Sequence, residues 1–283
     1  MKGKYGYKRD VTSGDRSLQD QIISHNKVTK LSHYTTLDSL KAILKKKEWL
    51  LNRIDLVDDN DECRIIGDNE VAERIFLACF TFTNEESPYH WKEYGKNKQE
   101  KAVCISLYKP ENCTILKGLI DNSRPIMDYT NQTRYRWFGS DAKPYIRPCE
   151  SLRTHKIELQ AYNVKYLEKQ MLDQEYATCF DFAILDKMGL FKEFRRWGQE
   201  KETRIRALLR CENGFEDIPF KKTKMLFLPI TFENLEKIEI IFGPQACDSE
   251  KEEIKELCKE YDNFSFRDSS LSIDDIKKEC NNK

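Results

Sequence analysis

The chain has 283 residues, of which 39% are hydrophobic and 34% are charged, and its 48 basic residues balance its 48 acidic residues. A chain of this length suits one large domain or two ordinary ones. The zero formal net charge gives no overall attraction to nucleic acid or to a membrane surface, so such a partner would have to bind a local patch.

Several classes of protein find no support in the sequence. No stretch approaches the roughly 18 consecutive apolar residues of a membrane helix, and residues 1–17 lack the apolar core of a signal peptide. We therefore expect a cytoplasmic protein with no membrane partner. The ten cysteines include no Cys-x-x-Cys pair and the four histidines show no ligand spacing, so no metal site is predicted.

The first third of the chain alternates between strand and helix patterns. Residues 1–28 are polar and predict a flexible N-terminal arm. A short strand is expected from Lys30, followed by a helix for which Thr36 to Ser39 are candidate caps. Apolar and β-branched residues predict buried strands at 74–83 and 102–108, with a turn and a short aromatic helix or loop between them.

Proline interrupts the middle of the chain, where residues 113–159 have poor periodicity, and we expect an irregular insertion at about 109–158. The remaining patterns predict a strand at 159–167, a helix at 174–194, strands at 200–209, 224–232 and 238–244, and an amphipathic helix at 248–261. This order predicts an α+β fold: a single domain at 29–265 with a central mixed or antiparallel sheet flanked by helices, and a polar tail at 266–283.

Glu200, Glu202, Arg204 and Arg206 lie at every second position just as the chain becomes apolar. In a helix these charges would share no face, whereas in a strand they would share one. The face could be a solvated strand surface with salt bridges or part of a functional site.

Two other stretches contain residues suited to chemistry. His33, Tyr34 and Thr35 lie in the first predicted strand, and Trp91 and Tyr94 follow the second. On composition alone, each stretch is more often a packed core element than a site. Together with a carboxylate at a strand start, however, hydrogen-bonding groups and flat rings are what cleavage of a nucleotide's glycosidic bond requires, because a fixed carboxylate stabilises the oxocarbenium-like sugar.

These stretches also resemble, in the same order, a bacterial and phage-associated family of unknown function. The matching segments are His33-Tyr34-Thr35 with the following Leu40-x-x-Ile43, the acidic turn 58–62, Cys79-Phe80, Trp91-x-x-Tyr94-Gly95, Trp197-x-x-Glu200-x-Glu202-x-Arg204 and Gly243-Pro244. The resemblance covers roughly residues 30–260, and its specificity lies in the order of the motifs. This family is in turn remotely similar to ADP-ribosyltransferases of the His-Tyr-Glu type, which implies a split central sheet.

The resemblance implies a role for each matched residue. His33, with Tyr34 and Thr35 beside it, would bind a ribose hydroxyl of NAD, and Tyr94 with Trp91 would stack on nicotinamide, although Tyr34 or Tyr89 could take the place of Tyr94. Glu202 would be the catalytic carboxylate and Glu200 would position or deprotonate the acceptor. Apart from the resemblance, Arg204 and Arg206 lie two and four residues after Glu202, and their charges would favour its ionisation or bind the NAD phosphates.

The resulting hypothesis is an NAD-dependent ADP-ribosyltransferase that modifies RNA, DNA or protein as a toxin or phage-defence effector, with a neutralising antitoxin as a further partner. The alternatives are an NAD glycohydrolase and an inactive protein that binds a nucleotide or a partner. Basic clusters at 45–47, 195–196 and 221–222 offer a nucleic-acid face, or are simply solvated. We expect Glu202→Gln to abolish activity and leave folding intact, because it removes the charge and keeps the shape.

Overall fold

The computed structural model describes residues 27–57, 69–94, 101–111, 113–121, 123–124, 126–128, 133–140, 143–148, 155–177, 187–211 and 223–281. Its strands are β1 (Lys30–Thr36), β2 (Glu48–Arg53), β3 (Ile75–Thr81), β4 (Ala102–Tyr108), β5 (Ile126–Asp128), β6 (Thr133–Ser140), β7 (Lys143–Pro148), β8 (His155–Asn163), β9 (Lys165–Leu167), β10 (Phe191–Glu193), β11 (Glu202–Cys211), β12 (Met225–Pro229), β13 (Lys237–Phe242) and β14 (Phe264–Asp268). Its helices are α2 (Leu37–Lys46), η1 (Ile54–Leu56), α4 (Asn69–Ala72), α5 (Pro88–Tyr94), α6 (Ile115–Leu119), α7 (Lys169–Ala177), α9 (Phe194–Trp197), α10 (Asp248–Cys258) and α11 (Ile273–Asn281).

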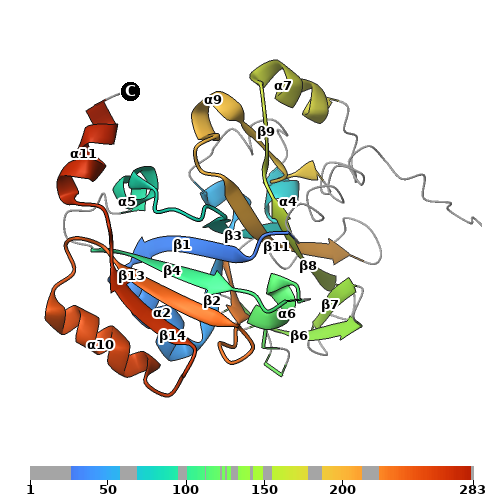
Figure 1. The fold of residues 1–283 in the computed structure, drawn as a ribbon. Coiled ribbons are helices and arrows are strands. Elements are labelled where there is room, and N and C mark those ends of the chain that lie inside the picture. Colours follow the sequence, from blue (N-terminus) through green and yellow to red (C-terminus); the bar gives the residue numbers. More distant parts are fainter. Residues whose placement is uncertain are drawn as a thin grey trace, which may run out of the picture.

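A mixed, mostly antiparallel sheet organises this α+β fold. Twelve strands pair in the order β11-β8-β7-β6-β5-β12-β2-β3-β1-β4-β13-β14, and β3 also pairs with β11. The extra pairing closes the strands from β11 to β3 into a circuit, from which β1, β4, β13 and β14 extend (Figure 1). Among the described strand pairs of this sheet, only β13–β14 is parallel, and β9 and β10 form a separate parallel pair.

One edge of β3 is divided between two partners, and this division creates a split in the sheet. Near its start, Phe76 and Leu77 pair with β2, and at its end Thr81 pairs with β1. The other edge of β3 pairs continuously with β11, from Ile75 to Thr81. The edge between Leu77 and Thr81 therefore faces the gap between β1 and β2.

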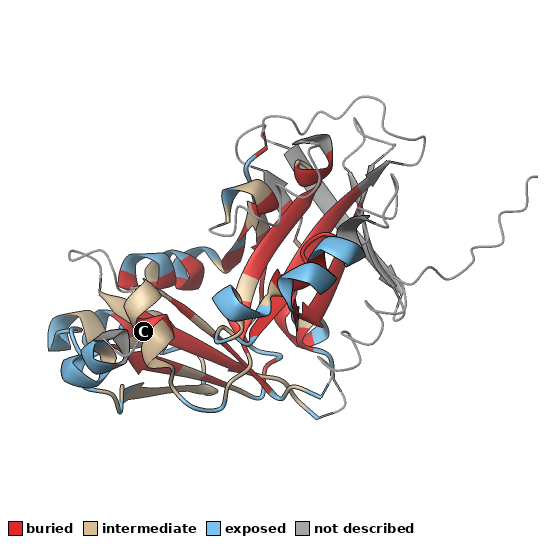
Figure 2. Ribbon diagram, turned by 90° about the horizontal axis from the view of Figure 1, so that it is seen from above, coloured by how far each residue is buried: buried red, intermediate tan, exposed pale blue. Residues whose placement is uncertain are grey.

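Helices cover both faces of the β1–β4–β13–β14 part of the sheet. α2 and α10 lie on one face, and α5 and α11 lie on the opposite face (Figure 1). α2 begins at Thr36, whose hydroxyl accepts a hydrogen bond from the Ser39 amide, and it buries Leu37, Leu40, Ile43 and Leu44 against the sheet. Most of the coloured central strands are buried, and the outer surfaces of the helices are exposed (Figure 2). Within the described residues, no helix is both long enough and apolar enough to cross a membrane.

Several predicted elements are confirmed because their patterns are local. β1, α2, β3, β4, β8, β11, β12, β13 and α10 occupy the segments where strands or helices were expected. In β11, Thr203, Ile205 and Ala207 face one way and are buried, as the alternation predicted. The acidic turn 58–62 lies outside the described residues, as does most of the expected N-terminal arm.

Other predictions were wrong. The segment expected to be irregular contains β5, β6 and β7, which join the main sheet, and Pro144 and Pro148 lie within β7. A helix was expected at 174–194, but α7 ends at Ala177. The last residues of that segment instead form a turn at Gly189 (φ 77°) and the strand β10. The expected polar tail includes α11, which packs on α5.

Candidate functional site

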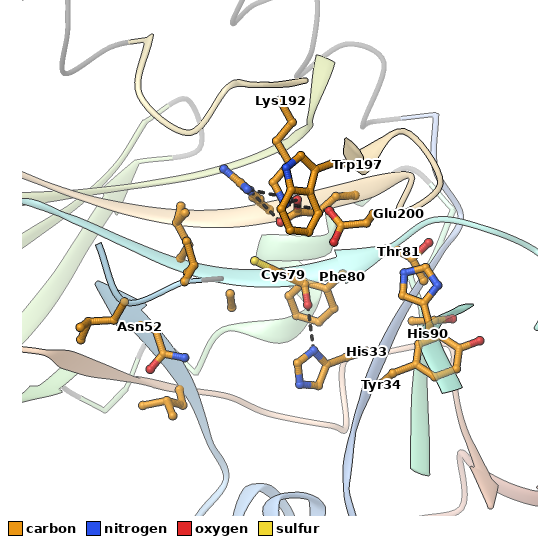
Figure 3. Close-up of a pocket in the computed structure, with 18 residues that line it drawn as sticks. His33, Tyr34, Asn52, Cys79, Phe80, Thr81, His90, Lys192, Trp197 and Glu200 are labelled. Atoms are coloured by element: carbon orange, nitrogen blue, oxygen red, sulfur yellow. Dashed lines mark hydrogen bonds and ion pairs between the residues drawn. The ribbon is translucent and has the colours of Figure 1, made fainter. Parts of the chain in front are cut away.

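A cavity of about 270 Å³ lies at the split in the sheet. Strands β1, β2 and β3 form its walls on one side, and β10, α9 and the start of β11 close the other (Figure 3). Its lining residues are Ser32, His33, Tyr34, Leu50, Asn52, Leu56, Val57, Leu77 to Thr81, His90, Lys192, Trp197, Glu200, Glu202 and Arg204.

The acidic part of the cavity is built around one lysine. Lys192 Nζ, from β10, lies 2.7 Å from Glu200 Oε2 and 2.9 Å from Glu202 Oε2. Glu202 opens β11, whereas Glu200 precedes the strand and is separated from it by Lys201, which has a left-handed backbone (φ 43°). The two carboxylates therefore reach a common cation without lying on one strand face, in contrast to the prediction from alternation.

Glu202 is also held by its own strand. Arg204 lies two residues further along on the same face, and its Nε and Nη2 donate to the two carboxylate oxygens of Glu202 at 2.7 and 3.1 Å. The Glu202 amide donates to the hydroxyl of Tyr166 at 2.9 Å. The carboxylate thus accepts two hydrogen bonds from Arg204 and forms an ion pair with Lys192.

The charged face of β11 is buried, so the hypothesis of a solvated strand face was wrong. Glu202, Arg204 and Arg206 are 4%, 0% and 0% exposed. Arg204 Nη1 donates to the carbonyl of Gly189 at 2.8 Å, and Arg206 donates to the carbonyl of Met188 and to the side chain of Gln160. Because both guanidinium groups are buried and already bonded, they are poorly placed to clamp the phosphates of a ligand.

The two glutamates have different ionisation behaviour. Burial by itself would raise the pKa of Glu202, but the charges of Arg204 and Lys192 and hydrogen bonds from Arg204 and Cys79 outweigh it and hold the pKa well below its usual range. For Glu200, burial and the neighbouring Glu202 charge prevail over Lys192 and raise the pKa to about 7. The cavity therefore holds one permanently ionised carboxylate beside one that exchanges a proton near neutral pH.

His33 lines the cavity from β1. Its Nδ1 lies 2.8 Å from the carbonyl oxygen of Cys79, at the divided edge of β3, and its ring contacts those of Trp49 and Phe80 (Figure 3). Burial lowers the pKa of His33, and the hydrogen bond to Cys79 opposes this shift only in part. In the neutral ring, Nδ1 donates to the carbonyl and Nε2 is left as an acceptor.

α5 contributes a residue that the sequence analysis did not select. His90 stacks on Tyr34 with ring centroids 5.0 Å apart, and both line the cavity. Burial lowers the pKa of His90 to about 4, against the opposing effects of the Glu202 charge and a hydrogen bond with the Glu200 backbone. His90 is therefore neutral at pH 7, and it lies close enough to Glu202, the candidate catalytic carboxylate, to be affected by its charge.

Glu86, whose side chain is 6% exposed, lies just before α5 and anchors it. The side chain of Glu86 accepts hydrogen bonds from Trp91 Nε1, Arg267 Nη1, the Ser269 hydroxyl, and the amide and hydroxyl of Ser270. These donors join the C-terminal segment after β14 to the helix that carries His90.

Trp197 is the aromatic residue that lines the acidic part of the cavity. Lys192 Nζ lies 4.7 Å from the centroid of its ring, and within the described part of the chain its buried Nε1 has no hydrogen-bond partner. The resemblance matched Trp197 but gave it no role, and the only sequence signal was its position three residues before Glu200.

The structure brings together five of the predicted site residues: His33, Tyr34, Glu200, Glu202 and Arg204 all line the cavity. Thr35 does not line it. Trp91 is buried in a separate cluster, where it packs on Tyr34 and against Gly243, at which a Cβ would lie 3.2 Å from the Trp91 ring and 2.6 Å from the Ala102 carbonyl oxygen. The side chain of Tyr94 and residue Gly95 lie outside the described part.

Comparison of the chain with protein-family models, with curated proteins and with solved structures gave no match.

Proposed function

We propose that the protein is an NAD-dependent ADP-ribosyltransferase that reacts at the cavity in the split sheet and transfers ADP-ribose to RNA, DNA or protein. The observation that carries the proposal is the pair of carboxylates joined by Lys192, with 2.7 and 2.9 Å separating its Nζ from Glu200 and Glu202. One is a fixed anion and the other an acid or base near pH 7. Glycosyl transfer through an oxocarbenium-like sugar uses both kinds of group.

In this reaction the bond between C1′ of the ribose and the pyridinium nitrogen breaks, and its electron pair leaves with nicotinamide. The ionised Glu202 stabilises the positive charge that develops on the sugar. An acceptor oxygen or nitrogen then bonds to C1′ and gives its proton to Glu200.

The unpartnered polar groups of the cavity support binding of such a substrate. Neither Trp197 Nε1 nor His33 Nε2 has a hydrogen-bond partner within the described residues. His33 Nε2 can accept a hydrogen bond from a ribose hydroxyl. In this assignment the Trp197 ring, rather than the Trp91 ring, offers the surface on which nicotinamide stacks. We also propose that the split sheet has the arrangement found in ADP-ribosyltransferases.

Hydrolysis of NAD is the second candidate, because Glu200 could deprotonate water as readily as an acceptor. Either activity could arrest growth, as in a toxin or phage-defence effector, and a neutralising antitoxin would then be a natural partner. The cellular role is proposed together with the activity.

The test is incubation of the purified protein with NAD labelled in its adenine half, with and without RNA, DNA or cell lysate. We expect release of nicotinamide and label in one class of macromolecule, whereas free ADP-ribose alone would assign the glycohydrolase. Glu200→Gln should lower the rate at least 100-fold, while Glu252→Gln, on the exposed face of α10, should leave it unchanged. The proposal fails if the wild-type protein releases no nicotinamide and shows no thermal shift with NAD.

A further inference from the structure

The outer face of β2 and β12 carries partly exposed apolar side chains next to the cavity. Leu50 pairs with Phe227 and Asn52 pairs with Met225, so these four side chains share one face of the two strands. Leu50 and Met225 are each 36% exposed, and Phe227 is half-buried. The intervening residues on each strand face the opposite way and belong to the core. We call Leu50, Asn52, Met225 and Phe227 the β2–β12 platform.

The platform is continuous with the cavity. Leu50 and Asn52 line the cavity, together with Leu56, which follows β2 and is 48% exposed. Asn52 lies at the opposite end of the cavity from Tyr34 and His90 in Figure 3. A molecule that extends past Asn52 would therefore leave the acidic end and reach the apolar surface.

The cavity is too small to enclose a large ligand, so part of such a ligand would have to lie outside it. Sites that enclose a drug-sized ligand have volumes of about 300–1,000 Å³, and this cavity has about 270 Å³. A dinucleotide has two bases, two riboses and a diphosphate, so only one of its halves fits inside. The other half must lie on the surface around the mouth.

The amide of Asn52 is suited to recognise a base. It is half-buried, and within the described residues its side chain has no hydrogen-bond partner. An Asn amide can accept from N6 and donate to N7 of adenine at the same time, a pairing that distinguishes adenine from other bases. Leu50, Met225 and Phe227 supply the apolar and aromatic surface on which a flat ring packs.

We propose that the β2–β12 platform binds the adenine half of the substrate, with Asn52 hydrogen-bonded to the adenine edge and the nicotinamide half enclosed at Glu202. This inference rests on the proposed function for the identity of the dinucleotide, but not for binding of the adenine itself. A positive charge also lies beside the platform, since Lys46 Nζ is 5.9 Å from the Phe227 ring centroid.

The test is equilibrium binding, measured by calorimetry, of AMP, nicotinamide mononucleotide, NAD and the NAD analogue that has hypoxanthine in place of adenine. Met225→Ser removes apolar surface from the platform, and Asn52→Leu keeps a similar size but removes both the amide donor and the amide acceptor. Met171→Ser, at an exposed position on α7, is the matched control.

We expect both platform variants to bind AMP and NAD about tenfold more weakly, and to bind nicotinamide mononucleotide as the wild type does. The wild-type protein should prefer NAD to the hypoxanthine analogue by about tenfold, and Asn52→Leu should remove this preference. Unchanged AMP affinity in both variants, or no AMP binding by the wild type, would overturn the inference. If the protein releases nicotinamide but the platform variants bind AMP normally, the proposed function stands and the adenine site is wrong. If the platform variants weaken AMP binding but no nicotinamide is released, the adenine site stands and the proposed function is wrong.

Discussion

Glu202 and Arg204 form a bidentate ion pair within a single strand, with both side chains buried and with Nε to Oε1 and Nη2 to Oε2 distances of 2.7 and 3.1 Å. Removing one member of a buried pair leaves the other charge without compensation, which typically costs about 3–5 kcal/mol. The pair therefore links the proposed chemistry to the stability of the fold.

Glu202→Gln is accordingly expected to lower the free energy of unfolding by about 3 kcal/mol as well as to abolish activity. This revises the expectation from the sequence that folding would be unaffected. Urea unfolding measures the effect, and Glu252→Gln, whose side chain is 70% exposed, should change stability by less than about 0.5 kcal/mol. An unchanged urea midpoint for Glu202→Gln would mean that the buried charges of Arg204 and Lys192 do not need this carboxylate for their stabilisation.

Glu200 predicts a pH dependence of both rate and stability. Since its pKa is raised to about 7, the group is mostly protonated at pH 6 and mostly ionised at pH 8. If Glu200 acts as the base, the rate should rise with pH through an apparent pKa near 7 and become pH-independent in this range, at a low level, in Glu200→Gln.

The stability effect of Glu200 has the opposite sign. Between its unfolded pKa of about 4.3 and its folded pKa of about 7, the folded protein binds more protons than the unfolded chain, so its contribution to stability is lost as pH rises. His33 and His90, whose pKa values are lowered, act in the other direction. The free energy of unfolding is therefore measured at pH 5 and pH 8 for both the wild type and Glu200→Gln. If it changes equally with pH in the two proteins, the raised pKa of Glu200 is contradicted.

The sequence predicted which residues of β11 share a face, but it could not predict what covers that face. Alternation is a local property, and it placed Glu202 and Arg204 together correctly. The residues that bury them, Lys192 and Gly189, come from a segment that was expected to be helical. A short apolar run does not distinguish a helix from a turn followed by a strand, so the burial of the charges was missed.

The choice between tryptophans also depended on tertiary structure. Trp91 and Trp197 each belong to a short segment with charged and aromatic neighbours, and nothing local separates a core ring from a cavity ring. Gly243 on the next turn after β13 packs against Trp91 and places it in the core, whereas Lys192 on β10 places Trp197 at the cavity. Such contacts between distant segments are set by the topology of the sheet.

His33 allows a structural role to be separated from a binding role by two substitutions. His33→Asn keeps a donor near the position of Nδ1, which bonds the Cys79 carbonyl, but lacks Nε2. We expect it to lose less than about 1 kcal/mol of stability and to bind NAD about tenfold more weakly. His33→Phe keeps the ring contacts with Trp49 and Phe80 but leaves the carbonyl unpaired, at a cost of about 1–3 kcal/mol. If His33→Asn binds NAD normally, Nε2 does not contact the substrate.

Glu86 should control the order of α5. Burial alone would raise its pKa, but the hydrogen bonds from Arg267, Ser269 and Ser270 outweigh this effect and hold the pKa at about 2. The stabilisation by the carboxylate is therefore present above its unfolded pKa of about 4.3 and is lost as pH falls toward 2.

We expect Glu86→Gln to increase hydrogen exchange in α5 and in residues 267–281 and to lower the free energy of unfolding by about 1–3 kcal/mol at pH 7, because several donors lose a charged acceptor. Glu85→Gln changes the same chemistry at the exposed neighbouring position and should have no such effect. Because α5 carries His90 to the cavity, the Glu86 variant should also bind NAD more weakly at equal folded fraction. Faster exchange in α5 with unchanged NAD binding would show that His90 is not positioned through this contact.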